Sequence, residues 1–300
     1  MAAVRGVVMK KLKALIPALV LVCCLLSGCS RHLYTEADMG KLHDVIGFVQ
    51  NEQTALNHVI YNSLPDQLAR MLVEDREFSY YMSTRDYDPE RPVMALTFDD
   101  GPKIGNTERI LDVLEKYNVT ATFFVVGSNV NENSEYLLKR MVDLGCEIGN
   151  HTNDHEILTG LDAAGMKAQI KATDDKIKQY AGVDCHLLRP PGGAYNDEVL
   201  ANAGKPLIYW NVDTNDWETL STEHVIHEIR TYKHDGSIIL MHDLYECTAE
   251  AMEVVIPELI SEGYQLMTIS DMAYAKGIDL ENGVNYYDLG MFPDEDEEEE

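Results

Sequence analysis

Seven short apolar runs, separated by segments with helical spacing, occupy the middle and C-terminal parts of the chain. The runs cover residues 93–98, 122–126, 147–149, 186–188, 207–212, 238–241 and 266–269. Between them, apolar residues recur at helical intervals, as in Ile110-Leu111-Val113-Leu114. Strands that alternate with helices imply right-handed crossovers and a parallel sheet. The pattern predicts an α/β fold, a closed or nearly closed (β/α) barrel, although an open doubly wound sheet has the same pattern.

Five of these runs end in a charged, histidine or turn motif. The motifs are TFDDGP at 97–102, HTNDH at 151–155, RPPGG at 189–193, DTNDW at 213–217 and LMH at 240–242. In a barrel the carboxyl ends of the strands converge on one face. We therefore expect the five motifs to meet there.

Two histidines and a pair of carboxylates suggest a metal site. His151 and His155 are four residues apart, so a helical turn or a tight loop places both rings on one side. Two imidazoles with one carboxylate leave positions open for water, as in catalytic zinc sites. The same ligands bind Fe(II) in oxygenases, but the downstream Arg, Asp-Trp and His motifs favour a hydrolase. Asp99 and Asp100 can share one site only if strand geometry ends there, and the following Gly-Pro permits that bend.

The five motifs, in this order, resemble those of the polysaccharide deacetylase family, also called the NodB-homology family or carbohydrate esterase family 4. The resemblance covers about residues 93–275 and implies a distorted barrel of about seven parallel strands. It assigns Asp100, His151 and His155 as ligands of a divalent metal ion. We expect Zn²⁺, although Co²⁺, Ni²⁺ or Mn²⁺ accept the same ligands. Asp99 would be the general base that deprotonates the attacking water.

The resemblance completes the set of predicted catalytic residues with three more side chains. Arg189 would orient Asp99, and a bidentate contact would keep that carboxylate ionised. His242 resembles the general acid that protonates the departing amine. Asp216 resembles the carboxylate that pairs with this histidine and raises its pKa.

Three residues are predicted to bind the substrate. Gly192 would offer its backbone N–H to an oxyanion. Trp217 and Leu240 resemble the walls of the pocket that holds the acetyl methyl group. Family members often carry an aromatic residue at the position of Gly192. Glycine keeps the backbone donor but removes one pocket wall, which bears on substrate preference.

The N-terminus has the order of a secretory signal. Arg5 and three lysines precede an apolar stretch, residues 14–26, that is too short to span a bilayer comfortably. The stretch ends at Leu26-Ser27-Gly28-Cys29, which resembles the bacterial lipobox. We therefore expect residues 1–28 to be a lipoprotein signal peptide and Cys29 to carry the lipid. The predicted protein is extracytoplasmic and anchored to the membrane by its acyl chains.

The rest of the chain divides into three predicted parts. Residues 29–92 have loose helical spacing and are expected to form a helical stalk or linker, for which a partner-binding role stays open. The segment 88–92, DPERP, marks the start of a catalytic domain at 93–276. Residues 277–300 are expected to be an acidic C-terminal tail.

Charge and missing motifs exclude other classes of protein. A net charge of −27 excludes a general nucleic-acid-binding surface, which needs clustered Lys and Arg. No GxxxxGK[ST] motif is present, and we expect no nucleotide cofactor. No GxSxG motif supports a serine nucleophile. Beyond Cys29 the cysteines are Cys146, Cys185 and Cys247, an odd number that implies no disulfide framework.

Together these features predict a metal-dependent hydrolase that removes N-acetyl groups from amino sugars of a cell-envelope polysaccharide. Peptidoglycan N-acetylglucosamine is the expected substrate, since a lipid anchor would hold the site near the cell wall. Chitooligosaccharides and acetylxylan are the alternative substrates. An alternative of another class is a wall-binding lipoprotein that keeps the fold without catalysis.

Overall fold

The computed structural model describes residues 88–290. The predicted signal peptide, Cys29, nearly all of the predicted stalk and the terminal acidic run lie outside the described residues, and those assignments stay predictions. Within residues 88–290, no helix has both the length and the apolar character needed to cross a membrane.

A parallel sheet forms the centre of the structure. Its strands are β1 (Val93–Asp99), β2 (Thr122–Val125), β3 (Glu147–Asn150), β5 (Val212–Asp213), β6 (Ile238–His242) and β7 (Gln265–Met267). The order is β3-β2-β1-β6-β5, with β7 paired to the first residues of β1. Asp99 is in register with Phe124 of β2 on one side and with His242 of β6 on the other. The ends of β1 and β6 therefore bring two motifs together.

The segment 207–213 closes this sheet into a barrel. Leu188 bridges to Asn150 at the end of β3 and to Leu207, the start of β4 (Leu207–Ile208). After three intervening residues the same segment becomes β5, which pairs with β6. The expected barrel is confirmed, and the open doubly wound alternative is wrong. The predicted run 186–188 contributes single bridges rather than a strand, and the predicted run 207–212 is two short strands.

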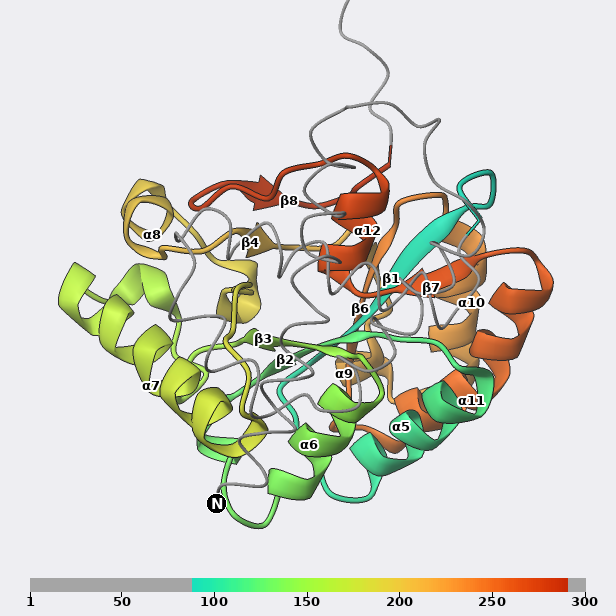
Figure 1. The fold of residues 1–300 in the computed structure, drawn as a ribbon, viewed down its shortest axis with the longest axis horizontal. Coiled ribbons are helices and arrows are strands. Elements are labelled where there is room, and N and C mark those ends of the chain that lie inside the picture. Colours follow the sequence, from blue (N-terminus) through green and yellow to red (C-terminus); the bar gives the residue numbers. More distant parts are fainter. Residues whose placement is uncertain (1–87, 291–300) are drawn as a thin grey trace, which may run out of the picture. The chain divides into compact units, whose positions relative to one another are not determined.

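Five helices cover the outer face of the sheet. They are α5 (Asn106–Tyr117), α6 (Glu135–Asp143), α7 (Ala163–Ala181), α10 (Thr222–Tyr232) and α11 (Glu246–Ser261). In the order α7, α6, α5, α11, α10, each contacts the next, and they follow one another around the sheet in Figure 1. Helix α7 shows the local reasons for its limits: Asp162 caps its start by accepting from Gly165 N, and Gly182 ends it in the left-handed region.

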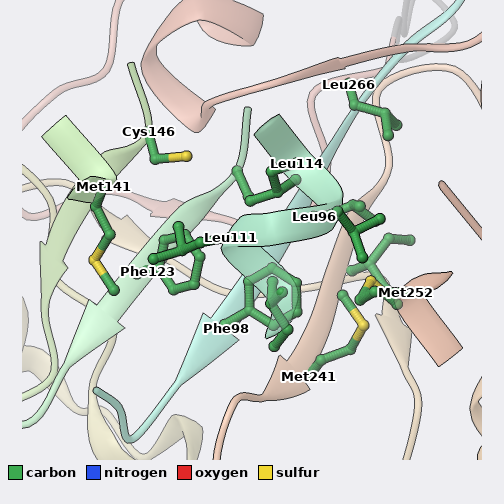
Figure 2. Packing of buried hydrophobic residues seen from close by; sticks show 14 of the residues in the cluster. Leu96, Phe98, Leu111, Leu114, Phe123, Met141, Cys146, Met241, Met252 and Leu266 are labelled. Atoms are coloured by element: carbon green, nitrogen blue, oxygen red, sulfur yellow. The ribbon is translucent and has the colours of Figure 1, made fainter. Parts of the chain in front are cut away.

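The strand alternation of β1 divides the core in two. Leu96 and Phe98 pack with Phe123, Leu111 and other residues between the sheet and the outer helices (Figure 2). The intervening residues of β1 point to the other side of the sheet, where Val93 and Ala95 meet helix α12 (Ile269–Ala275). All seven residues of β1 are buried, as expected for a strand covered on both faces.

Residues 277–290 fold onto the barrel, so their prediction as part of an acidic tail is wrong. Strand β8 (Asn285–Tyr286) pairs in parallel with β4. Leu289 is buried and donates its N–H to the carbonyl of Gly236. Apolar residues among the acidic ones anchor this segment, and the run 294–300 alone keeps the composition of a tail.

Candidate active site

The chain leaves strand geometry directly after β1, as the Gly-Pro pair predicts. Asp100 has a φ of 73°, which turns its carboxylate to the same site as that of Asp99. The Asp100 carbonyl accepts from Asn129 Nδ2 at 2.7 Å, which holds the turn. A Cβ added at Gly101 would lie 2.1 Å from Asp243 Oδ2, so no larger residue fits there.

Asp100, His151 and His155 gather at this turn. Each offers one ligand atom, and the three atoms lie within 4.8 Å of one another. Asp100 Oδ1 is 3.4 Å from His151 Nε2 and 3.3 Å from His155 Nε2. The two histidines come from the loop after β3 rather than from a helical turn.

This cluster fits a divalent metal ion. Asp100 Oδ1 is buried without a hydrogen-bond partner. A bound cation would offset the free-energy cost of leaving this oxygen unpaired. His151 Nδ1 donates to the Arg189 carbonyl at 2.6 Å, which leaves Nε2 as the ligand atom. Burial lowers the pKa of His151 to about 3, so the ring is neutral, as a ligand must be.

Asp99 is buried against Arg189. Arg189 Nη1 donates to Asp99 Oδ1 at 2.7 Å, so this is a single contact and not the bidentate one expected. The other oxygen, Oδ2, is 3.6 Å from His151 Nε2 and faces the metal cluster. Burial raises the pKa of Asp99, while Arg189 and His242 act in the opposite direction.

Arg189 is fully buried, and its other donors also have partners. Nη1 also donates to Thr97 Oγ1 at 2.7 Å. Nε and Nη2 donate to the carbonyls of Ile208 and Tyr209, both at 2.9 Å. The guanidinium carbon lies 4.3 Å from the centre of the Phe124 ring. A buried charge with this many partners is fixed in place, which suits a residue that positions a base.

His242 and Asp216 form the second ion pair of the site. His242 Nδ1 donates to Asp216 Oδ1 at 2.7 Å, which leaves Nε2 for the substrate side. Asp216 is fully buried and its Oδ2 accepts from the His242 backbone N–H and from Thr248 Oγ1. Burial lowers the pKa of His242, but the hydrogen bond and charge of Asp216 outweigh it and raise the pKa to about 9.

The predicted substrate-binding residues lie next to these groups. Gly192 has a φ of 63°, and its N–H has no partner among residues 88–290. Trp217 directly follows Asp216 and is half exposed. Leu240 lies two residues before His242 on the same face of β6 and is buried.

Sequence reasoning missed four residues that shape the site. Ile157 Cδ1 lies 3.4 Å from where a Cβ at Gly192 would be, so this exposed side chain stands beside the wall that glycine leaves open. Thr248 and Asn129 act through single hydrogen bonds that no spacing predicts. Asp243 could have been found from the sequence, because it directly follows His242 at the end of an apolar run. In the structure, burial raises the pKa of Asp243 to about 7.

Comparison with known proteins identifies the family. A family model described as polysaccharide deacetylase matches residues 86–206. A solved family 4 acetyl xylan esterase from Clostridium thermocellum, in complex with a cobalt ion, is 33% identical, with a TM-score of 0.64 over 66% of this chain and 100% of that one. The chain belongs to the polysaccharide deacetylase family. The α/β barrel is thus that of the family, and its Asp-His-His cluster is the metal site typical of this family.

Two similar curated proteins are named as peptidoglycan deacetylases. The peptidoglycan-N-acetylmuramic acid deacetylase PdaC of Bacillus subtilis is 40% identical over 189 residues, 63% of this chain and 40% of that protein. The peptidoglycan-N-acetylglucosamine deacetylase PgdA of Listeria monocytogenes is 38% identical over 195 residues, 65% of this chain and 41% of that protein. The match spans about two fifths of these relatives.

Proposed function

We propose that this chain is a metal-dependent deacetylase that removes N-acetyl groups from amino sugars of a cell-envelope polysaccharide, with peptidoglycan N-acetylglucosamine as the substrate. The observation that carries the proposal is the register of β1 and β6. In this register Asp99 lies beside His242, and both lie next to the three candidate metal ligands. The raised pKa of His242 makes it a cationic acid at neutral pH. A base and an acid at one metal are what amide hydrolysis requires. The names of PdaC and PgdA support the choice of polymer.

Asp100, His151 and His155 are the proposed ligands. When bound there, a divalent cation supplies a Lewis acid for the acetamide carbonyl and for the attacking water. Zn²⁺ is the proposed ion, and the cobalt in the Clostridium relative agrees with a site that accepts several ions.

The chain's own residues then divide the proton transfers. Asp99 Oδ2 takes the proton from the water, while Arg189 keeps Oδ1 fixed. The free N–H of Gly192 donates to the oxygen on which negative charge develops. His242 gives its Nε2 proton to the departing amine nitrogen. Without this proton the nitrogen would have to leave as an amide anion, which is a very poor leaving group. A pKa of about 9 keeps His242 protonated at neutral pH, as this role demands.

Trp217 and Leu240 are the proposed walls for the acetyl methyl group. The fit of a small apolar group between an exposed indole and a buried leucine does not depend on the polymer. O-deacetylation of acetylxylan is therefore the second candidate activity, and the esterase from Clostridium favours it. An alkoxide leaves more readily than an amide anion, so the raised pKa of His242 favours the amide substrate.

Mass spectrometry of acetate loss tests these alternatives. The substrates are N-acetylglucosamine oligomers, muropeptides and acetylated xylan, each with and without a chelator. We expect amide activity that is lost on chelation and in Asp100→Ala. In His242→Gln, we expect amide hydrolysis to fall far more than ester hydrolysis. Activity that survives chelation and Asp100→Ala would exclude the metal site, and no activity on any of the three substrates would favour the wall-binding alternative.

The lipid anchor at Cys29 is a separate proposal that places this chemistry at the outer surface of the membrane. The charged start, the apolar stretch and the small residues before Cys29 support it. Expression with a labelled fatty acid tests it in the full chain. Label in the wild type and in Cys146→Ser, but not in Cys29→Ser, is the expected result.

A further inference from the structure

Three tyrosines form a cluster beside β4, which we call the tyrosine surface: Tyr195, Tyr209 and Tyr287. Tyr287 stacks on Tyr209 with ring centres 4.6 Å apart, and Tyr195 meets Tyr209 edge to face at 5.4 Å. Tyr209 is buried, whereas Tyr195 is 42% and Tyr287 44% exposed. The buried ring of Tyr209 thus supports the two partly exposed rings, which pack against it. Because packing fixes them, they can bind a ligand with little loss of side-chain entropy.

The tyrosine surface adjoins the turn that carries the proposed oxyanion donor. A Cβ added at Gly193 would lie 3.7 Å from Tyr209 Cε1, so the edge of this ring lies close to the turn that contains Gly192. Tyr195 follows two residues after Gly193 and precedes α8 (Asp197–Asn202). A polymer chain with one unit at Gly192 can therefore continue over these tyrosines.

The tyrosine surface also offers hydroxyl groups. The Tyr209 hydroxyl is buried without a hydrogen-bond partner. Burial and its hydrogen bond with Tyr195 raise the pKa of Tyr287 to about 12, so its hydroxyl is neutral at physiological pH. Burial likewise raises the pKa of Tyr209. The surface therefore combines apolar ring faces with neutral hydroxyl groups.

We propose that Tyr195 and Tyr287 bind a sugar ring of the polysaccharide next to the unit that is deacetylated. The inference rests on the proposed function, because it takes its ligand from that reaction. The faces of a pyranose ring carry C–H groups and its rim carries hydroxyls, which match aromatic faces and phenolic oxygens. Tyr287 lies outside residues 86–206, where the family model matches, and follows β8, whose pairing with β4 brings it beside Tyr209. The folded C-terminal segment thus contributes to substrate binding.

Steady-state kinetics of the full chain test this with a long and a short substrate. In Tyr195→Ala and Tyr287→Ala we expect the KM for an N-acetylglucosamine hexamer to rise about tenfold, since an aromatic contact contributes on the order of that factor. Hydrolysis of 4-nitrophenyl acetate, which has no sugar ring, should be unchanged. Tyr195→Phe and Tyr287→Phe keep the ring and should raise the KM about twofold or less. Tyr232→Ala, which removes an exposed tyrosine from α10, is the matched control.

Two results would overturn the inference. One is an unchanged KM for the hexamer in both alanine variants, and the other is an equal loss on the hexamer and on the aryl ester. A binding measurement separates the tyrosine surface from the proposed deacetylase function. Calorimetric titration of the hexamer into His242→Gln serves here, because it needs no turnover. If no acetylated sugar is a substrate, the proposed function fails, whereas a Kd about tenfold weaker in the added alanine variants still supports the tyrosine surface. Equal affinity, or no binding, refutes it.

Discussion

Asp216→Asn tests the assignment of the general acid, because it removes one charge and keeps the shape of the side chain. In the wild type, burial alone would lower the pKa of His242, and the hydrogen bond and charge of Asp216 raise it to about 9. The rise from the ordinary value of 6.5 corresponds to about 3 kcal/mol. Without the charge, we expect the pKa of His242 to fall to 6.5 or below. At pH 8 a histidine with a pKa of 9 is roughly 90% protonated, whereas one with a pKa of 6.5 is protonated to about 3%.

The assay is the pH dependence of kcat on an N-acetylglucosamine oligomer and on an aryl acetate. For the oligomer we expect activity at pH 8 to fall about thirtyfold in Asp216→Asn, with the alkaline limb displaced to lower pH. The aryl acetate should lose much less, because its leaving group needs no proton. The free energy of unfolding provides a second measurement. The pair of His242 and Asp216 stabilises the wild-type fold fully below pH 6.5, and this contribution is lost as pH rises through about 9. An alkaline limb that stays near pH 9 in the variant would refute the reasoning.

Three further perturbations test the fold around the site by thermal unfolding and activity. Arg189→Leu leaves the buried Asp99 without its partner and should lower the free energy of unfolding by about 3–5 kcal/mol, whereas a loss below about 1 kcal/mol would contradict the buried pair. Gly101→Ala drives a Cβ into a buried carboxylate and should abolish activity, while Gly160→Ala, with open space around its Cβ, should leave activity unchanged. Phe123→Ala empties part of the core in Figure 2 and should cost about 3–5 kcal/mol with the optimum pH of activity preserved; a shifted optimum would count against its purely structural role.

The sequence predicted the parts of the fold that depend on local patterns. Apolar runs and helical spacing located β1, β2, β3, β6 and β7, because each buries residues with its own regular period. The run 207–212 could not be divided in advance, since its two halves differ in their partner strands and not in their composition. Residues 277–290 were assigned to a tail for a related reason. Their acidic composition hid the few apolar contacts, such as Leu289, that hold them to the barrel.

The candidate site likewise has some features that the sequence motifs predict and others that they do not. The metal cluster lies at strand ends, where parallel strands converge, so the motifs were sufficient to predict that Asp100, His151 and His155 meet. The single contact between Arg189 and Asp99 depends on which other acceptors surround the guanidinium, and these are carbonyl groups of a distant segment. Ile157 was missed because its distance from Gly192 follows from the path of a loop, for which spacing carries no information.

Arg189 makes the integrity of the catalytic apparatus inseparable from the closure of the barrel. Its side chain joins Asp99, the proposed base, to a carbonyl of the closing segment, and its own carbonyl accepts from His151, a proposed metal ligand. Partial unfolding that releases the segment 207–213 must therefore disable the base and the ligand together. A descendant that loses Asp99 would inherit an unsatisfied buried guanidinium, with a penalty of several kcal/mol. Such a lineage would carry this destabilisation unless other changes in its core compensated for it, so the loss of Asp99 costs stability as well as activity.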